Sequence, residues 1–279
     1  MKLRRVGSEH IAAVGQGTWN IEASSRQQVV NAIRRGLDAG MNHIDTAEMY
    51  GSGEAERIVG EAIAGRRQQV FLVSKVLPSN ASREGTVQAC ERSLQNLQTD
   101  HLDCYLLHWR GRYPLAETIA AFEQLQGAGK IRSWGVSNFD TPDLDEALAV
   151  AGPGRIDCNQ VLYHLQERAI EHSVIPWCEG HGVAVVAYSP FGSGQFPKPA
   201  SAGGKVLNRI AEAHGATVRQ VALAFLLRYP SLLTIPKASG AGHAVENAAA
   251  ADLTLTPSEI VQIEAAFPRG RKPRSLPMI

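Results

Sequence analysis

The stretch HIDTAEMYGSGEAERIVGEAI, residues 43–63, contains a strand-like run, a glycine turn and a helix-like run in immediate succession. The short apolar run ends in Asp45, Tyr50 follows, and the turn Gly51-Ser52-Gly53 leads into apolar residues at helical spacing. This succession predicts one strand–turn–helix unit. Asp45 and Tyr50 of this unit are then candidate catalytic residues.

The same stretch also allows a second interpretation, because a strand, Gly-x-Gly and a helix are the order of a dinucleotide-binding turn. The next glycine, Gly60, comes too late for that pattern. Glu54 at the start of the helix would repel a pyrophosphate, although it suits the helix dipole. We therefore interpret these glycines as a sharp turn and expect the phosphate-binding residues elsewhere.

Outward from this unit, short apolar runs alternate with helix-like segments along the whole chain. The runs cover residues 11–17, 41–46, 70–75, 102–108, 131–137, 155–161, 183–189 and 232–237, and the helix-like segments include 26–40, 83–97, 115–130, 141–150, 217–229 and 256–267. Strand–helix alternation with short connections indicates parallel strands joined by right-handed crossovers. Eight such units predict an α/β fold, a (β/α)8 TIM barrel, as a single domain over residues 1–279. A Gly/Pro/Ser-rich insert at 189–204 is expected to be a functional loop.

The composition excludes several classes of protein. The chain has 279 residues, of which 44% are hydrophobic and 20% charged, with a formal net charge of +1. This balance gives no electrostatic reason to expect nucleic acid or a membrane surface as a partner. There is no apolar run of membrane-spanning length and no secretory signal pattern. Four separated cysteines are typical of reduced core thiols, so we expect a cytoplasmic protein.

Polar residues follow seven of the eight predicted strands. They are Asp45, Lys75, His108, Ser137-Asn138, Asn159-Gln160, Tyr188-Ser189 and Lys237. The carboxyl ends of parallel barrel strands meet at one rim, where barrel enzymes carry their active sites. The pattern therefore predicts one shared site.

The first of these residues indicate a proton donor that faces a carbonyl group. Lys75 beside Asp45 is expected to stay charged, which disfavours both a metal ion and a Schiff-base lysine. Such a cation would lower the pKa of Tyr50, which is about 10 in a free tyrosine, toward the range of a general acid. His108 could hydrogen-bond a substrate oxygen.

Eight motifs in order then match a known family. They are GQGTW (15–19), the stretch 43–63, VFLVSK (70–75), LDCYLLHW (102–109), GKIRSWGVSNF (129–139), NQVLYH (159–164), AYSPFGSG (187–194) and IPKASGAGHAVEN (235–247). Over nearly its whole length the chain resembles the aldo-keto reductases, and among them the small bacterial enzymes that reduce methylglyoxal and related aldehydes. The resemblance implies a catalytic tetrad of Asp45, Tyr50, Lys75 and His108, with Tyr50 as proton donor and NADPH as hydride donor.

The resemblance also implies a cofactor site. Its residues would be Gly17, Thr18, Ser137, Asn138, Gln160, Tyr188, Ser189, Phe191, Ser193, Lys237, Ala238, His243, Glu246 and Asn247. Two positions depart from the family pattern, because Ala238 replaces a common serine and His243 an arginine that grips the 2′-phosphate. A neutral imidazole holds a phosphate less well than a guanidinium does, so we expect NADH to be used alongside NADPH.

For the substrate, the resemblance implies a pocket walled by Trp19 and Trp109 beside Tyr50 and His108, with the tail 268–279 near its mouth. We expect reduction of small aldehydes and ketoaldehydes to alcohols, and of acidic carbonyls drawn by Arg112 or the basic tail. Two alternatives stay open: a cofactor-binding regulatory subunit without enzymatic activity, and a Schiff-base aldolase on the same barrel. We expect a monomer with a small-molecule partner.

Overall fold

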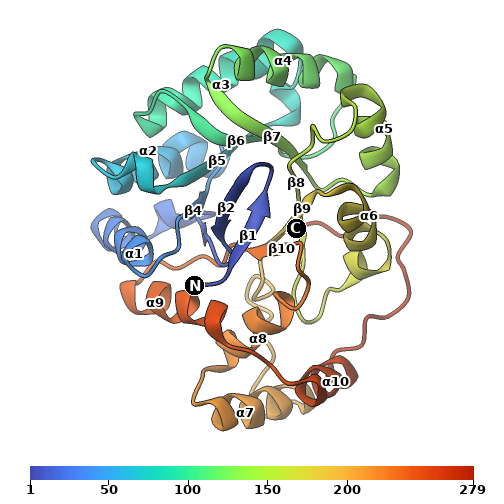
Figure 1. Ribbon diagram of the computed structural model, residues 1–279. Helices are drawn as coiled ribbons and strands as arrows, with labels where there is room; N and C mark the ends of the chain where they lie inside the picture. Colours follow the sequence, from blue (N-terminus) through green and yellow to red (C-terminus); the bar gives the residue numbers. More distant parts are fainter.

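Eight parallel strands form the inner layer of the computed structural model, which describes all of residues 1–279 (Figure 1). They are β3 (Gln16–Gly17), β4 (His43–Asp45), β5 (Phe71–Val76), β6 (Leu102–Leu107), β7 (Ile131–Ser137), β8 (Cys158–Leu162), β9 (Ala184–Tyr188) and β10 (Leu232–Thr234), in that order around the sheet. Parallel bridges from Val14 to Thr234 and from Gly17 to Lys237 join the two edges. The sheet therefore closes on itself, and the predicted (β/α)8 barrel is confirmed.

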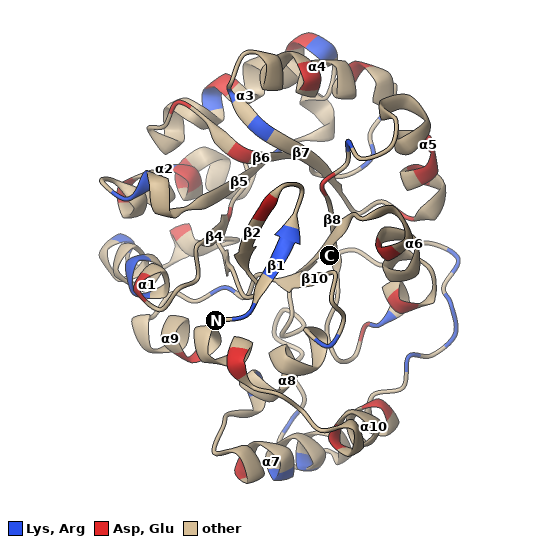
Figure 2. Cartoon of the chain, in the orientation of Figure 1, with Lys and Arg blue, Asp and Glu red and all other residues tan.

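Helices lie outside the strands (Figure 1). They are α1 (Arg26–Asp38), α2 (Glu54–Ile63), α3 (Arg83–Leu97), α4 (Leu115–Gly127), α5 (Thr141–Ala151), α6 (Val174–His181), α7 (Ala202–His214), α8 (Val218–Leu226), α9 (Ala241–Ala249) and α10 (Pro257–Ala266). Most of them form a ring, and α7 and α10 pack beyond α8 on its outer side (Figure 1). Charged residues of both signs are spread over these helices (Figure 2), as the small net charge suggests. None of the helices combines the length and apolarity that a membrane crossing would need.

The predicted insert at 189–204 is too long, because α7 already begins at Ala202. Gly203 and Gly204 suggested a loop in the sequence. In the structure a Cβ at Gly203 would collide with the ring of Phe267, and one at Gly204 with the carbonyl of Lys198. These glycines therefore permit close packing inside a helix, with no turn at either position.

The first predicted strand, 11–17, is divided in the structure. Its beginning belongs to an antiparallel hairpin of β1 (Leu3–Val6) and β2 (Glu9–Ala12), and only β3 joins the barrel. Val6 and Ile11 of the hairpin pack in a cluster with inward-facing residues of the barrel strands, including Phe71. The hairpin thus covers the end of the barrel where the strands begin.

The inward side chains change character along each strand. In β5, Phe71 and Val73 belong to the apolar cluster under the hairpin, and Lys75 comes two residues later. In β6, Leu106 lies in the same cluster, and His108 follows the strand at the same spacing. Because side chains alternate faces with a period of two, the interior is apolar at one end and carries ionisable groups at the other.

The turn after Tyr50 is as sharp as predicted. Gly51 (φ 54°), Ser52 (φ 53°) and Gly53 (φ 89°) are all left-handed, which glycine adopts without strain. A Cβ on Gly51 would also lie 2.7 Å from the side chain of Glu22. The glycines therefore turn the chain from Tyr50 directly into α2.

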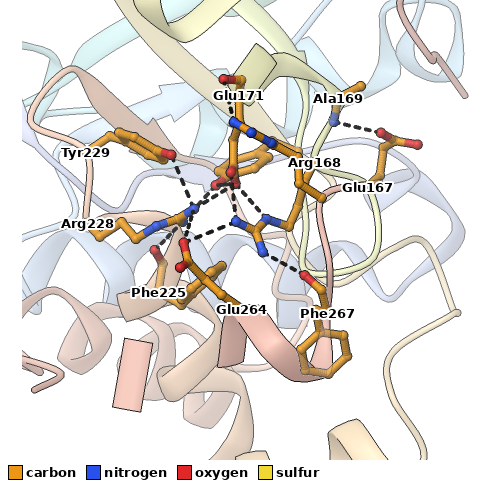
Figure 3. Close-up of polar contacts among 11 residues, drawn as sticks. Glu167, Arg168, Ala169, Glu171, Phe225, Arg228, Tyr229, Glu264 and Phe267 are labelled. Atoms are coloured by element: carbon orange, nitrogen blue, oxygen red, sulfur yellow. Dashed lines mark hydrogen bonds and ion pairs between the residues drawn. The ribbon is translucent and has the colours of Figure 1, made fainter. Parts of the chain in front are cut away.

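A buried ionic network fixes the chain where the C-terminal tail leaves α10 (Figure 3). Glu171 accepts hydrogen bonds from Arg168 Nη2 (2.7 Å) and Arg228 Nη2 (2.7 Å) and is almost fully buried. Arg168 Nη1 also donates to the carbonyl oxygen of Phe267 (2.6 Å), and Arg269 donates to that of Glu171 (3.4 Å). The two arginines hold the pKa of Glu171 at about 2, although its burial acts in the opposite direction. The tail thus starts from a rigid point.

Candidate active site

A cavity of about 620 Å³ opens at the end of the barrel where the strands finish. Fifteen of its lining residues are sequence-predicted site residues: Gly17, Thr18, Trp19, Asp45, Tyr50, His108, Trp109, Ser137, Asn138, Gln160, Tyr188, Ser189, Phe191, Ser193 and Lys237. Met278 and Ile279, of the tail predicted near the mouth, also line the cavity. The sequence did not single out the remaining lining residues, which are Asn20, Met49, Pro190, Gly194 and Ile235. Most of these are direct neighbours of predicted residues, so proximity in the sequence was the signal available.

Lys75 lies beneath the cavity and connects two of the predicted tetrad residues. Its Nζ donates to Asp45 Oδ1 (2.5 Å), to the Thr46 carbonyl oxygen (2.8 Å) and to the Tyr50 hydroxyl (3.3 Å). The side chain of Lys75 is fully buried, and that of Asp45 is 1% exposed. Burial alone would lower the pKa of Lys75, but Asp45 and Tyr50 outweigh it, so the pKa is raised and the ammonium stays charged. A charged lysine cannot act as the nucleophile of a Schiff-base aldolase.

Two side chains orient Asp45. Gln160 Nε2 donates to Asp45 Oδ2 (2.7 Å), and Thr18 Oγ1 donates to the Asp45 carbonyl oxygen (2.8 Å). The sequence analysis assigned Gln160 and Thr18 only to the cofactor. The contact of Gln160 with Asp45 joins residues 115 positions apart, and no local sequence pattern reports such a contact.

The pKa of Tyr50 differs from the expectation. Burial raises the pKa of Tyr50, and the positive charge of Lys75 reduces that effect without reversing it. The expected influence of Lys75 therefore has the right direction, but the expected net decrease is wrong. Tyr50 consequently keeps its proton throughout the neutral range. A protonated phenol is the state that a proton donor needs.

His108 is a neutral imidazole beside Tyr50. Burial, with a further effect of the Lys75 charge, lowers the pKa of His108 to about 2. Its Nδ1 is buried without a partner, which leaves Nε2 as the ring nitrogen free to meet a substrate. The rings of His108 and Tyr50 meet edge to face with centroids 5.8 Å apart, and Trp109 lies 4.8 Å from His108.

Three polar side chains at the ends of β7 and β8 form one hydrogen-bonded group. Asn138, in a left-handed conformation (φ 61°), donates to the His108 carbonyl oxygen (3.0 Å) and accepts from the Tyr188 hydroxyl (2.8 Å). Ser137 Oγ donates to the Gln160 carbonyl oxygen (2.8 Å). Gln160 Oε1 has no partner within the protein. The group therefore presents fixed amide and hydroxyl atoms to the cavity, which fits the carboxamide of a nicotinamide ring.

The opposite part of the cavity suits phosphate groups. Ser189 (φ 50°) and Ser193 (φ 49°) both adopt left-handed conformations, and their hydroxyls are hydrogen-bonded to each other (3.1 Å). Lys237 is the only lysine or arginine that lines the cavity, and its Nζ donates to the Asn20 carbonyl oxygen (3.3 Å). Tight turns and a single cation are the groups that this part of the cavity could offer to phosphates.

Four predicted cofactor residues lie outside the cavity, on the loop after β10 and on α9. They are Ala238, His243, Glu246 and Asn247. His243 is exposed, with its Nδ1 3.5 Å from a Glu246 oxygen, and Glu246 also accepts a hydrogen bond from Thr217 Oγ1 (2.6 Å). Asn247 is buried. The structure therefore brings His243 and Glu246 together, and it leaves all four residues outside the cavity that the tetrad residues line.

The expected attraction of acidic carbonyls by Arg112 or by the basic tail has no basis in the structure. Arg112 is exposed and contacts Tyr113 outside the cavity. The tail reaches the cavity only with its apolar last residues, Met278 and Ile279. The mouth is therefore apolar at this side, with Trp19 half-exposed nearby. No group of three or more potential metal ligands is assembled in the chain.

The sequence and the structure of the chain are both similar to those of known proteins. The sequence profile of the Aldo/keto reductase family matches residues 13–267. The chain is 43% identical to the methylglyoxal reductase YeaE of Escherichia coli (strain K12) over 98% of this chain and 97% of that protein. It is 34% identical to the glyoxal reductase of Bacillus subtilis (strain 168), covering 90% and 87%. A crystal structure of an aldo/keto reductase from Klebsiella pneumoniae in complex with NADP and acetate superposes with a TM-score of 0.93 at 45% identity, covering 99% of both chains.

Proposed function

The chain belongs to the aldo/keto reductase family, and from this premise we propose that it reduces small aldehydes and ketoaldehydes such as methylglyoxal to alcohols with NADPH. One observation carries the proposal: a buried Asp45–Lys75 pair holds the protonated Tyr50 hydroxyl at a cavity that also contains a neutral His108. The names of the two bacterial relatives support aldehydes of this size.

In the proposed reaction the protein positions the carbonyl oxygen and supplies its proton. Bound NADPH supplies the hydride. His108 Nε2 hydrogen-bonds the oxygen and fixes its position. Tyr50 donates its proton as negative charge develops there, which is favourable because an alkoxide is far more basic than a phenolate. The ammonium of Lys75, 3.3 Å from the phenol oxygen, stabilises the negative charge left on Tyr50.

The residues fit the cofactor in two separate regions. Ser137, Asn138 and Gln160 would hold the carboxamide of the nicotinamide ring, with Tyr188 against the ring. Ser189, Phe191, Ser193 and Lys237 would hold the pyrophosphate end, with Gly17 and Thr18 at the facing wall. This assignment follows the chemistry of the groups that line the cavity, because amides suit the carboxamide and tight turns with a lysine suit phosphates.

At the adenosine end we propose that Ala238, His243, Glu246 and Asn247 contribute, with a weaker preference for NADPH over NADH than an arginine at position 243 would give. The exposed imidazole of His243 lies 3.5 Å from a Glu246 carboxylate oxygen. That carboxylate would compete with a 2′-phosphate for the imidazole. A guanidinium would bind the phosphate more strongly because it can bind bidentately.

The substrate site would be bounded by Trp19, Trp109 and the apolar tail end at Met278. These walls leave room for small carbonyl compounds beside Tyr50, and they offer no cation for an acidic one. We further propose that the enzyme acts as a cytoplasmic monomer. A single chain provides all four catalytic groups, and its four cysteines are buried free thiols.

The test is the loss of NADPH absorbance with methylglyoxal, measured for the wild type and for Tyr50→Phe. Removal of the proton donor should reduce kcat by about 10²-fold or more while NADPH binding is retained. A wild-type protein that binds NADPH but reduces no carbonyl compound would instead indicate a regulatory, non-enzymatic subunit. Near-normal turnover in Tyr50→Phe would refute the role of Tyr50.

A further inference from the structure

Arg219, at the start of α8, contacts the long loop after β9. The centre of its guanidinium lies 5.6 Å from the Phe191 ring centroid and 5.5 Å from that of Phe196. The two rings themselves pack edge to face, 5.8 Å apart. Phe191 lines the cavity between Ser189 and Ser193, so Arg219 reaches the wall of the cavity through an aromatic side chain.

The charge of Arg219 is not used within the protein. It takes part in none of the ion pairs in the chain, and it makes no side-chain hydrogen bond. Glu246, on α9, accepts a hydrogen bond from the hydroxyl of Thr217, two residues before Arg219, and not from Arg219 itself. Arginine stacks on aromatic rings through its face, which leaves the N–H groups on its edge free. Arg219 is therefore a positioned and unpaired cation.

We infer that Arg219 is a dinucleotide-binding residue, which ties the loop of residues 189–201 over the pyrophosphate and places its guanidinium edge toward the phosphate oxygens. The inference rests on the proposed use of NAD(P)H. It adds a residue to which neither the sequence motifs nor the cavity lining assigns a role.

The charge balance of the cavity favours a second cation near the pyrophosphate. Lys237 is the only lysine or arginine among the lining residues, apart from the tetrad lysine that Asp45 neutralises from beneath. A pyrophosphate carries two negative charges, so Lys237 alone leaves one uncompensated. A guanidinium matches adjacent phosphate oxygens with parallel hydrogen bonds, which an ammonium cannot do.

The contact of Arg219 with the loop after β9 predicts that the binding of both NADPH and NADH depends on this arginine. Arg219 packs on Phe191 and Phe196, which belong to the loop that carries Ser189 and Ser193. It makes no contact of this kind with α9, where His243 lies. The pyrophosphate is common to NADPH and NADH, so the loss of Arg219 should weaken the binding of both cofactors to a similar extent.

The experiment measures the Kd of NADPH and of NADH by quenching of tryptophan fluorescence, and the NADPH dissociation rate by stopped flow. The variants are Arg219→Ala, Arg219→Lys and Phe196→Leu, since Phe196 touches Arg219 without lining the cavity. Arg209→Ala serves as the matched control, because Arg209 is an exposed helix arginine bonded only to Gln262. Urea unfolding of each cofactor-free variant verifies that the fold is intact.

We expect Arg219→Ala to raise both Kd values on the order of tenfold and to accelerate dissociation of NADPH. Arg219→Lys and Phe196→Leu should show part of this effect, and Arg209→Ala none. Unchanged Kd values in Arg219→Ala would overturn the inference, and so would a loss restricted to NADPH, since that would place the charge at the 2′-phosphate. If the wild type binds neither cofactor, the proposed function itself fails, whatever the variants do.

Discussion

Replacement of Asp45 by asparagine would test how Lys75, the lysine of the proposed tetrad, is held in its charged state. The change removes one negative charge and keeps the shape of the side chain. Lys75 would then have no anionic partner, because its other hydrogen-bond acceptors are the Thr46 carbonyl and the neutral Tyr50 hydroxyl. Lys75 itself is fully buried, so water cannot replace the lost carboxylate.

The cost follows from this burial. Removing one partner of a buried ion pair leaves an uncompensated charge and typically costs about 3–5 kcal/mol. We expect the Asp45→Asn variant to lose this much free energy of unfolding at pH 7, unless Lys75 loses its proton, which would limit the loss. Its turnover should also fall sharply, since a neutral Lys75 no longer stabilises charge on Tyr50.

The pH dependence gives the sharper signature. In the wild type the pKa of Lys75 is raised, so its stabilising contribution is complete below the ordinary lysine pKa of about 10.4 and is lost only as the pH rises through the raised value. Without Asp45, burial acts on Lys75 with less opposition and its pKa falls below that of the unfolded chain. The unfolded chain then binds more protons, so the stability of Asp45→Asn should increase between pH 7 and pH 9.

Urea unfolding at pH 7, 8 and 9 would measure both effects. The contribution of Lys75 to the free energy of unfolding of the wild type should be nearly independent of pH over this range. The variant should regain part of its lost free energy of unfolding as the pH rises. The double variant Asp45→Asn/Lys75→Met is the control, because it removes the buried charge and should regain stability. A loss below about 1 kcal/mol in Asp45→Asn, or the same pH slope in both proteins, would refute this account of the pair.

Three further predictions concern other charged groups. Because the pKa of His108 is about 2, kcat/KM for carbonyl reduction should not show an ionisation near pH 6.5; a histidine-like inflection that disappears in His108→Gln would contradict the neutral imidazole. Glu171→Gln should cost about 3–5 kcal/mol in urea unfolding at pH 7, since two buried arginines lose their buried carboxylate and keep only the half-exposed one of Glu264. Glu264→Gln should cost about 1 kcal/mol or less. The pKa of Glu171 is depressed, so its contribution should be present above about pH 4.3 and be lost as the pH falls toward 2. His243→Arg should raise the ratio of kcat/KM for NADPH over NADH about tenfold, and an unchanged ratio would place the 2′-phosphate elsewhere.

The parts of the fold that depend on local pattern could be predicted from the sequence. The barrel strands were found because apolar runs recur with a polar residue at each end, and α3 has the predicted bounds 83–97. Helix α7 was missed because Gly203 and Gly204 look like loop residues until their packing against Phe267 and Lys198 is known. The hairpin that closes the barrel was missed because β2 and β3 follow each other in one apolar run.

In the site, residue identities could be predicted and their electrostatics could not. The sequence places Asp45, Tyr50, Lys75 and His108 at strand ends, and the structure brings them around one cavity. Whether the pKa of Tyr50 rises or falls depends on how burial compares with the nearby Lys75 charge, and burial is a property of the whole fold. The neighbours of Tyr50 could be predicted from the sequence, but the depth at which they are buried could not.

Gln160 is a buried residue whose contact with Asp45 bears on the proposed mechanism. Its Nε2 donates to the carboxylate of Asp45. Its Oε1 would then be available to the carboxamide of the proposed cofactor. A long amide side chain can donate from its nitrogen and accept at its oxygen without carrying a charge. A glutamate would place a second carboxylate against Asp45, and a leucine would leave Asp45 Oδ2 without a donor. Asp45 raises the pKa of Lys75, and Lys75 lies 3.3 Å from the Tyr50 hydroxyl. In the proposed function, one uncharged side chain would therefore connect recognition of the nicotinamide to the proton donor.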